Sequence, residues 1–456
     1  MNRITIYFCA LMGFLFCGIG NLHSQETIQR VLPKEEAVQL MLQNNFGVKL
    51  ANNDVLIAEN NSDFLNSGYL PSVFGLAGAS FDRSNSTTDF GGALGQDGNP
   101  RPDNVIEGAE TTRYNASINL DYTLFDGLGR HYNYQQLKER YNLSQLEARE
   151  AIENTMIQLF TVYYEVARIE ENIAILEEAL SISKQRETRS QYQFEYGQAN
   201  KLEVLNAQVD ITTDSINLLN ARQQLQNAQR DLNIVLASDL EDLKLADTTV
   251  VFINPLQMDD YAQEAIQNNV SLLQIEQDIV ISDYQIKGAK AVFLPTVGLT
   301  GSYGWNLANN PASAFFPSTV NTSNSLSLAA NLRWNLFDGG RSVTDLKNAR
   351  IALQSQELLQ EQLQQQVYRD IANARGDYNN ALAIYNLQEQ NVRTNVANFE
   401  RSQERFKLGQ VTSIEFRQAQ LNLLNALVTK NAAKYTAKIA ELRLLQLSGQ
   451  LLNVSI

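Results

Sequence analysis

The feature that most constrains this chain is that its sequence repeats once along its length. Two motifs recur at one common spacing, Asn44-Asn45 as Asn268-Asn269 and Leu70-Pro71 as Leu294-Pro295. Two further motifs share a slightly shorter spacing, Leu124-Phe125-Asp126-Gly127 with Leu336-Phe337-Asp338-Gly339 and Gly197-Gln198 with Gly409-Gln410. A spacing that is otherwise constant and shortens once indicates an internal duplication with one longer loop in the first copy.

Each copy contains strand-like and helix-like stretches, so the repeated unit is a whole αββα module and not a short solenoid turn. We place the two copies at about residues 34–237 and 258–449 and join them by an irregular linker over residues 238–259. This organisation predicts a single intertwined domain of mixed α and β structure, most of it helical.

Residues 1–24 have the pattern of a secretory signal peptide. A basic residue, Arg3, precedes an apolar run over residues 4–19, and small or polar residues follow. We therefore expect an exported chain that is cleaved after residue 24. Both cysteines, Cys9 and Cys17, lie inside this segment, so the mature chain is expected to contain no disulfide.

Composition excludes several classes of function. The net charge of −14 makes nucleic acid an unexpected partner. Only two histidines occur, and His23 leaves with the signal peptide, so a histidine-based catalytic or metal site is not expected. The chain also lacks a Walker-type phosphate loop, a G-x-S-x-G elbow and an H-E-x-x-H motif. We therefore predict no catalytic residue, no cofactor and no metal, and hence no enzyme.

Four stretches alternate apolar and polar residues with period two, which predicts strands with one apolar and one polar face. They lie near residues 69–84, 112–126, 293–309 and 323–338. In the second stretch Ala116, Ile118, Leu120, Tyr122 and Leu124 share one face. Runs of about 9 to 12 residues suit a tilted strand that crosses a bilayer core of roughly 30 Å.

Such strands also suit a soluble antiparallel sheet with one face on a core. Three observations favour the membrane: the predicted export, the hydrophilic loops, and aromatic residues near strand ends, which are Tyr69, Tyr122, Tyr303, Trp305 and Trp334. The aperiodic stretch 85–110 is expected to be the long loop, outside the cell. Four strands cannot close a barrel, and open edges in lipid leave backbone groups unpaired, so several chains must combine their strands.

The remaining sequence has a seven-residue apolar repeat that predicts packed helices. Two proline-free stretches of 70 residues separate Gly127 from Gly197 and Gly339 from Gly409, and each would form a helix of about 105 Å. Shorter helices are expected to precede the strands, over residues 34–69 and 260–294, and to follow each long helix. Two short helices stacked end to end would match one long helix. Asp126 and Asp338 are expected to cap the long helices.

Several of these motifs resemble the TolC family of outer-membrane efflux proteins. They are Leu70-Pro71-Ser72, Leu294-Pro295-Thr296, the run from Trp334 to Arg341, the tips Phe194-Glu195-Tyr196-Gly197 and Phe406-Lys407-Leu408-Gly409, and the segments 205–208 and 417–420. The resemblance implies a homotrimer, with a 12-stranded β-barrel in the outer membrane of a Gram-negative bacterium and a long α-helical coiled-coil barrel in the periplasm. It also implies a passive exit duct that joins a periplasmic adaptor, or membrane fusion protein, and an inner-membrane transporter of the RND or ABC type.

The resemblance further implies roles for residues at the two hairpin tips. The adaptor-docking candidates are Phe194, Gly197, Gln198, Phe406, Gly409 and Gln410. Family members often close the periplasmic end with an arginine and two aspartates, whereas Val411, Glu415 and Gln418 occupy the matching positions here, with Glu203 in the first copy. A constriction in this chain must therefore be built differently.

The acidic candidates have a structural interpretation as well. Glu203 follows Asn200 by three residues and Glu415 follows Thr412 by three, which is the spacing of a helix N-cap with a capping glutamate. We hypothesise that Glu415 both caps its helix and narrows the tunnel mouth.

Three functions account for parts of the sequence. The exit duct of a tripartite efflux pump explains the export, duplication, strands and helices together. The exit duct of a type I protein secretion system explains the same features, and a periplasmic coiled-coil scaffold explains the helices alone.

Overall fold

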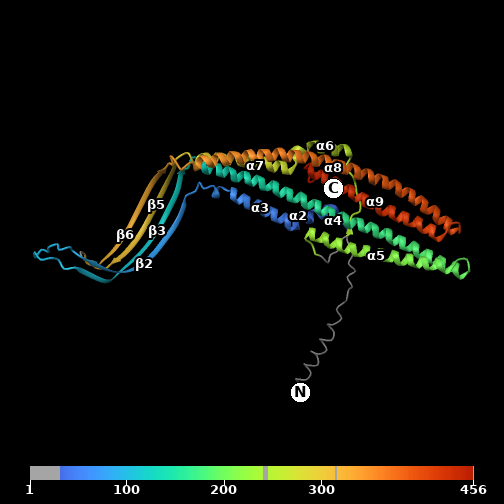
Figure 1. The fold of residues 1–456 in the computed structure, drawn as a ribbon, viewed down its shortest axis with the longest axis horizontal. Helices are drawn as coiled ribbons and strands as arrows, with labels where there is room; N and C mark the ends of the chain where they lie inside the picture. Colours follow the sequence, from blue (N-terminus) through green and yellow to red (C-terminus); the bar gives the residue numbers. More distant parts are fainter. Residues whose placement is uncertain (1–30, 240–244, 314–315, 455–456) are drawn as a thin grey trace, which may run out of the picture.

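The computed structural model describes residues 31–239, 245–313 and 316–454, so the expected signal peptide lies outside the described residues. The chain has two parts that follow one another along its longest axis (Figure 1). One part is an antiparallel sheet, and the other is a bundle of long helices. None of the helices within the described ranges is long and apolar enough to span a lipid bilayer.

The sheet has four strands, β2 (Ser72–Thr88), β3 (Asn104–Phe125), β5 (Thr296–Asn310) and β6 (Thr319–Arg333). Their order is β2-β3-β5-β6 with every pair antiparallel, so the central pair joins the two halves of the chain. Both edges of this sheet, along β2 and β6, are unpaired within the described part of the chain. Every residue of β6 is exposed, so no other described segment covers that edge strand.

The strand boundaries differ from the prediction in two places. Part of the expected loop at 85–110 belongs to the strands, because β2 continues to Thr88 and β3 begins at Asn104, and residues 89–103 form the connection between them. The Asn85 side chain accepts a hydrogen bond from the Gly108 N–H at 2.7 Å, at the bulge between the two strands. Polar residues on both faces hide the alternation there. In contrast, β6 ends at Arg333 and not near residue 338.

Two helices of 67 residues each, α4 (Gly129–Glu195) and α8 (Arg341–Lys407), run the length of the bundle. At 1.5 Å per residue each spans about 100 Å. Their starts follow the prediction, because an Asp126 oxygen accepts from the Arg130 N–H at 2.9 Å and an Asp338 oxygen from the Ser342 N–H at 3.0 Å. Gly127 has φ of +69°, and a Cβ there would lie 2.4 Å from the Ala291 carbonyl oxygen. Glycine is therefore required at this turn.

The helices that precede the strands are each broken in two, whereas single helices were predicted over residues 34–69 and 260–294. The first half has α2 (Lys34–Asn44) and α3 (Phe46–Ser62), followed by a short 3-10 turn, and the second has α6 (Pro255–Asn268) and α7 (Val270–Ala291). Asn45 and Asn269 separate the members of each pair and cap the second member with their side chains. Asparagine caps favour a helix start over a continuous helix, which explains the break.

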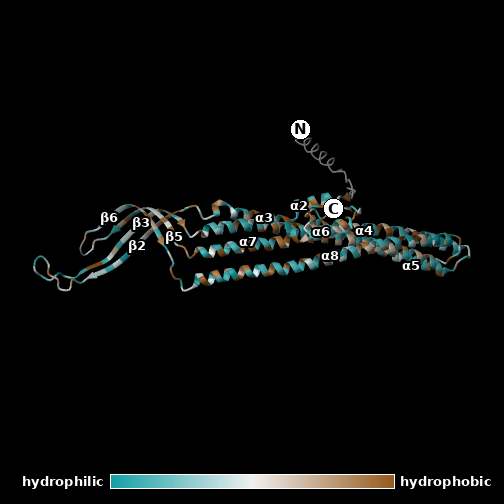
Figure 2. Cartoon of the chain, turned by 90° about the horizontal axis from the view of Figure 1, so that it is seen from above, coloured by the Kyte–Doolittle hydropathy of each residue, from teal (hydrophilic) through white to brown (hydrophobic). Residues whose placement is uncertain are grey.

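The remaining helices, α5 (Lys201–Leu236) and α9 (Ser413–Leu447), return from the far end of the bundle. Along the bundle, α3 precedes α5 beside α4, and α7 precedes α9 beside α8 (Figure 1). Hydrophobic and hydrophilic residues are intermixed along these helices, as Figure 2 shows. Because α3 and α5 lie in turn beside α4, and α7 and α9 beside α8, each long helix is matched by two shorter ones, as the sequence predicts.

The main hydrophobic core lies near the middle of the bundle, where α2 and α6 meet the long helices. The linker, predicted to be irregular over residues 238–259, contains β4 (Leu245–Ala246), which pairs in parallel with β1 (Val31–Leu32), and ends where α6 begins. The buried Tyr163 hydroxyl donates to the Leu32 carbonyl at 2.6 Å and accepts from the Asp247 N–H at 2.7 Å. One tyrosine of α4 thus fastens the linker and the N-terminal strand to the bundle.

The candidate functional site at the hairpin tips

The two helix hairpins end in tips of the same geometry. Gly197 and Gly409 have φ of +72° and +70°, and each follows the C-cap residue of its long helix, α4 or α8. The Gln198 N–H donates to the Gln193 carbonyl at 2.7 Å, and the Gln410 N–H donates to the Arg405 carbonyl at 2.8 Å. This is the Schellman arrangement, which ends a helix on a left-handed glycine. The sequence prediction that the Gly-Gln pairs mark hairpin tips is confirmed.

The return helices begin with the caps that the sequence predicts. The Thr412 N–H donates to Glu415 Oε2 at 2.7 Å, and the Glu415 N–H donates to Thr412 Oγ1 at 3.2 Å, which completes a capping box. In the other tip the Asn200 side chain accepts from the Glu203 N–H at 3.1 Å. Hydrogen bonds from Thr412 lower the pKa of the Glu415 carboxyl group below its ordinary value. Glu415 is therefore ionised and engaged with its own helix at neutral pH.

A small groove of about 300 Å³ lies between the tips and brings together most of the candidates from both hairpins. Glu203 comes from the first tip, and Val411 and Glu415 come from the second. The docking candidates in the same groove are Phe406, Gly409 and Gln410. Two carboxylates from opposite halves of the sequence thus line one groove at the end of the bundle.

A second groove of about 490 Å³ lies between α4 and α8 beside the tips. Gln198 lines it together with Tyr192 and Tyr196, which are 58% and 78% exposed. The sequence prediction did not include these two tyrosines, although aromatic residues next to a tip glycine could have indicated them. Exposed aromatic side chains beside polar groups are typical of protein-binding surfaces.

Four predicted residues lie elsewhere or act differently. Phe194, Gly197 and Gln418 line neither groove. The Lys201 ammonium group lies over the Phe194 ring at 5.2 Å, and the Gln418 amide donates to Asn422 at 2.9 Å. Phe406 is only 8% exposed and stacks on Phe416 with ring centroids 4.8 Å apart. Phe406 therefore packs inside the tip.

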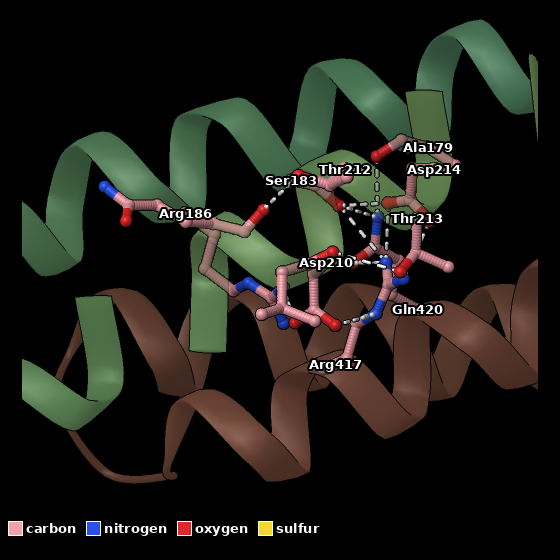
Figure 3. Close-up of polar contacts among 11 residues, drawn as sticks. Ala179, Ser183, Arg186, Asp210, Thr212, Thr213, Asp214, Arg417 and Gln420 are labelled. Carbon is pink, nitrogen blue, oxygen red and sulfur yellow. Dashed lines mark hydrogen bonds and ion pairs between the residues drawn. The ribbon is translucent and has the colours of Figure 1, made fainter. Parts of the chain in front are cut away.

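The sequence does not predict a cluster of four charged residues just behind the tips, three of them buried and Asp210 partly exposed (Figure 3). It joins Arg186 of α4, Asp210 and Asp214 of α5, and Arg417 of α9. Arg417 lies within the segment 417–420 that carries part of the family resemblance, but its partners lie in the other half of the sequence.

Within the described ranges, no group of three or more histidine, cysteine, aspartate or glutamate side chains is placed to hold a metal ion.

Comparison with known proteins identifies the family. The family model described as "Outer membrane efflux protein" matches residues 37–238 and 261–450. The outer membrane efflux protein BepC of Brucella suis is 20% identical over 334 residues, which cover 73% of this chain and 72% of BepC. The outer membrane protein TolC of Vibrio cholerae is 24% identical over 301 residues, which cover 65% of this chain and 68% of that protein.

The fold is shared with solved outer membrane channels. The Campylobacter jejuni CmeC outer membrane channel superposes with a TM-score of 0.71 at 18% identity, over 92% of this chain and 86% of CmeC. The helical bundle, the sheet and the order of the elements are therefore those of this channel fold. Because the family model covers most of the sequence in both halves, this chain is a member of the outer membrane efflux protein family, the TolC family, and resides in the outer membrane with an extension into the periplasm.

Proposed function

We propose that three copies of this chain assemble into the passive exit duct of a tripartite efflux pump. In this assembly the sheet lies in the outer membrane, the helices cross the periplasm, and the tips contact a periplasmic adaptor that brings an inner-membrane transporter. The observation that carries the proposal is the sheet, because it has open edges and an apolar face with no cover in the described chain.

The exposed apolar face supports a lipid environment. Ile118 pairs with Tyr303, and Tyr303 pairs with Leu326, so the three side chains form one row across three strands. They are 61%, 56% and 71% exposed. A row of this kind is unfavourable in water and favourable against acyl chains. Lipid contact also requires that the edge strands be paired, because each unpaired backbone group in hydrocarbon costs several kcal/mol.

An assembly of three copies would pair the edge strands and leave the apolar row in contact with lipid. If β2 of one chain pairs with β6 of the next, three four-stranded sheets close into one barrel of twelve strands. The helices of the same three chains would then surround one tunnel. A helical part of about 100 Å is long enough to extend far from the membrane toward a partner in the inner membrane.

The assembly can be tested on the protein extracted from outer membranes into lipid nanodiscs. We expect a particle with three chains of 51.1 kDa, less the signal peptides, and a conducting pore in planar bilayers. A cysteine in β2 combined with one in β6 should give disulfide-linked dimers and trimers, whereas two cysteines in β3 should give none, because that strand is paired on both sides within its chain. A monomer that washes off the membrane would contradict the duct and favour a scaffold.

A further inference from the structure

The two halves of the chain contact each other where the sheet meets the helical bundle. Residues 126–128 form the turn from β3 to α4, and residues 292–295 form the turn from α7 to β5. Gly127 of the first turn lies so close to the second half that a Cβ atom there would be 2.4 Å from the Ala291 carbonyl oxygen and 2.8 Å from the Leu294 Cβ atom. Position 127 therefore has no room for a side chain.

The duplication provides a second copy of both segments. The turn from β6 to α8, residues 334–340, contains Gly339 at the position that matches Gly127. The connection from α3 to β2, residues 63–71, matches the turn from α7 to β5 through its Leu-Pro pair. These two segments adjoin the two opposite edge strands of the sheet, β6 and β2. A Cβ atom at position 339 would have no atom of the described chain within 4 Å apart from its sequence neighbours, so the contact made at Gly127 has no counterpart in the single chain.

A left-handed φ favours glycine but does not require it in this kind of turn. Each turn has two successive left-handed residues, which are Gly127 and Leu128 in the first copy and Gly339 and Gly340 in the second. Leu128 shows that the second of these positions accepts a side chain at φ of +71°. The first position is glycine in both copies, and at Gly127 the neighbouring segment leaves no space for anything larger. A neighbouring segment at the same place would likewise require glycine at position 339.

Apolar side chains on both unmatched segments are uncovered. Leu336 and Phe337 are 81% and 85% exposed, whereas the matching Leu124 and Phe125, beside the turn that has its partner, are 50% and 38% exposed. On the connection from α3 to β2, Leu65 is 78% exposed. Burial of such side chains against another protein surface is favourable. Both segments therefore have the character of an interface.

The helices next to these segments differ in the same way. α7 lies between the two long helices, whereas α3 lies beside α4 alone of the two. Ile281 of α7 is accordingly buried, and the matching Ile57 of α3 is exposed. The outer side of α3 and the outer side of α8 are thus the free faces that a second copy of the chain would bring together.

Pairing of β6 with β2 of the next copy, as in the proposed barrel, places the unmatched segments side by side. β2 begins and β6 ends at the end of the sheet that faces the bundle (Figure 1). We propose that residues 334–340 of one copy pack on residues 63–71 of the next, with Gly339 against the carbonyl group of Ser67, which matches Ala291. This inference deepens the proposed function, because it assigns the contact that joins neighbouring copies below the barrel, and it rests on that function for the assembly itself. The joint between sheet and bundle then has the same contact within and between chains.

Two alanine variants test the contact on protein extracted from outer membranes into mild detergent. Gly339→Ala and Gly340→Ala each add a methyl group at a left-handed residue, with φ of +73° and +90°, and both sites have open space in the single chain. Only Gly339→Ala would also clash with the next copy. We expect the ratio of trimer to monomer in native mass spectrometry to fall about tenfold or more for Gly339→Ala and to change little for Gly340→Ala. Equal ratios in the two variants, as expected if lipid alone covers this region, would overturn the proposal.

A cross-link tests the same contact without relying on stability. Leu336→Cys combined with Leu65→Cys should give linked dimers and trimers with a short bismaleimide, and each single variant should give none. The mature chain is expected to contain no other cysteine. Absence of linked chains in the double variant, while cysteines in β2 and β6 do link, would overturn this contact and leave the duct intact. A wild-type chain that is monomeric in the membrane would instead contradict the duct, and the contact with it.

Discussion

The side-chain amide of Asn269 donates to the carbonyl oxygen of Leu447 at 2.9 Å, while its Oδ1 accepts from the N–H groups of Ser271 and Leu272 at 3.1 and 3.2 Å. One side chain therefore begins α7 and completes the end of α9. In the first half, Asn45 does the same between α3 and α5, because its amide donates to the Val235 carbonyl at 2.8 Å. The repeated Asn-Asn pair thus marks the joint at which two short helices stack beside one long helix.

A pair of substitutions separates the two roles of Asn269. Asn269→Ser keeps a capping oxygen and removes the amide that reaches Leu447, whereas Asn269→Ala removes both. We expect Ser to lower the free energy of unfolding by about 1 kcal/mol and Ala by about 2 kcal/mol. Thermal unfolding of the two variants measures the difference. A Ser variant as stable as the wild type would mean that the bridge between helix ends contributes nothing.

Substitution by alanine should change the stability of the protein in opposite directions at two glycines of the same hairpin. Gly409 has φ of +70° and open space around it, so Gly409→Ala adds backbone strain without a clash and should cost about 1 kcal/mol. Gly376 lies in the interior of α8 and also has open space, so Gly376→Ala should stabilise by about 0.5 to 1 kcal/mol. Equal effects on the melting temperature would contradict the left-handed tip.

The carboxyl group of Glu170 should make stability depend on pH. Burial is the main cause that raises the pKa of this group to about 7. The Ala246 N–H donates to a carboxylate oxygen of Glu170 at 3.2 Å, and this hydrogen bond lowers the pKa in part. Because the folded pKa is raised, folding favours the protonated form of this carboxyl group. Its contribution to the free energy of unfolding is fully present below the unfolded pKa of about 4.5 and is lost as pH rises through the folded pKa of about 7.

Glu170→Gln keeps the acceptor for the Ala246 N–H and removes the titration. We expect the variant to be more stable than the wild type at pH 8 by about 1 to 2 kcal/mol. Its free energy of unfolding should also change less between about pH 5 and 8, the range in which the wild-type carboxyl group loses its proton. Glu178→Gln, an exposed position on the same helix, is the control. A wild-type profile that is already flat across this range would contradict a buried carboxyl group.

Glu415→Gln tests whether the capping carboxylate also acts on ions. Because hydrogen bonds from Thr412 hold its pKa below the ordinary value, the carboxylate is ionised at neutral pH, and its negative charge is lost only as pH falls through the lowered pKa. In planar bilayers we expect the variant to prefer cations less than the wild type does. Glu404→Gln, an exposed acid that pairs with Lys407, is the control. Equal conductance and ion selectivity in Glu415→Gln would leave capping as its sole role.

Local chemistry explains what could be predicted from the sequence. The long helices and their tips depend on residues next to each other in the chain, such as Asp126 before α4 and Gly197 after it. The repeated Asn-Asn pair does not by itself predict the break at Asn269, because a cap and a helical position look alike until the partner carbonyl of Leu447 is known.

The buried cluster could not be predicted for a related reason. Arg417 pairs with Asp214 across the two halves of the chain, and a seven-residue apolar repeat contains no information about which charged residues pair. The family resemblance makes Phe406 a docking candidate, but its contact with Phe416, which buries it in the tip, is formed only when α8 and α9 pack together. Pairing between distant helices, and not local propensity, decides both positions.

In-cell photo-crosslinking from Gln198 and Gln410 tests most directly whether the tips join this chain to a pump. A photoreactive residue at the exposed Gln365, in α8 and far from the tips, serves as the control. We predict that mass spectrometry finds a periplasmic adaptor attached at both tip positions and not at the control. Capture of only other copies of the chain, or the same products at all three positions, would contradict the duct that docks through its hairpin tips.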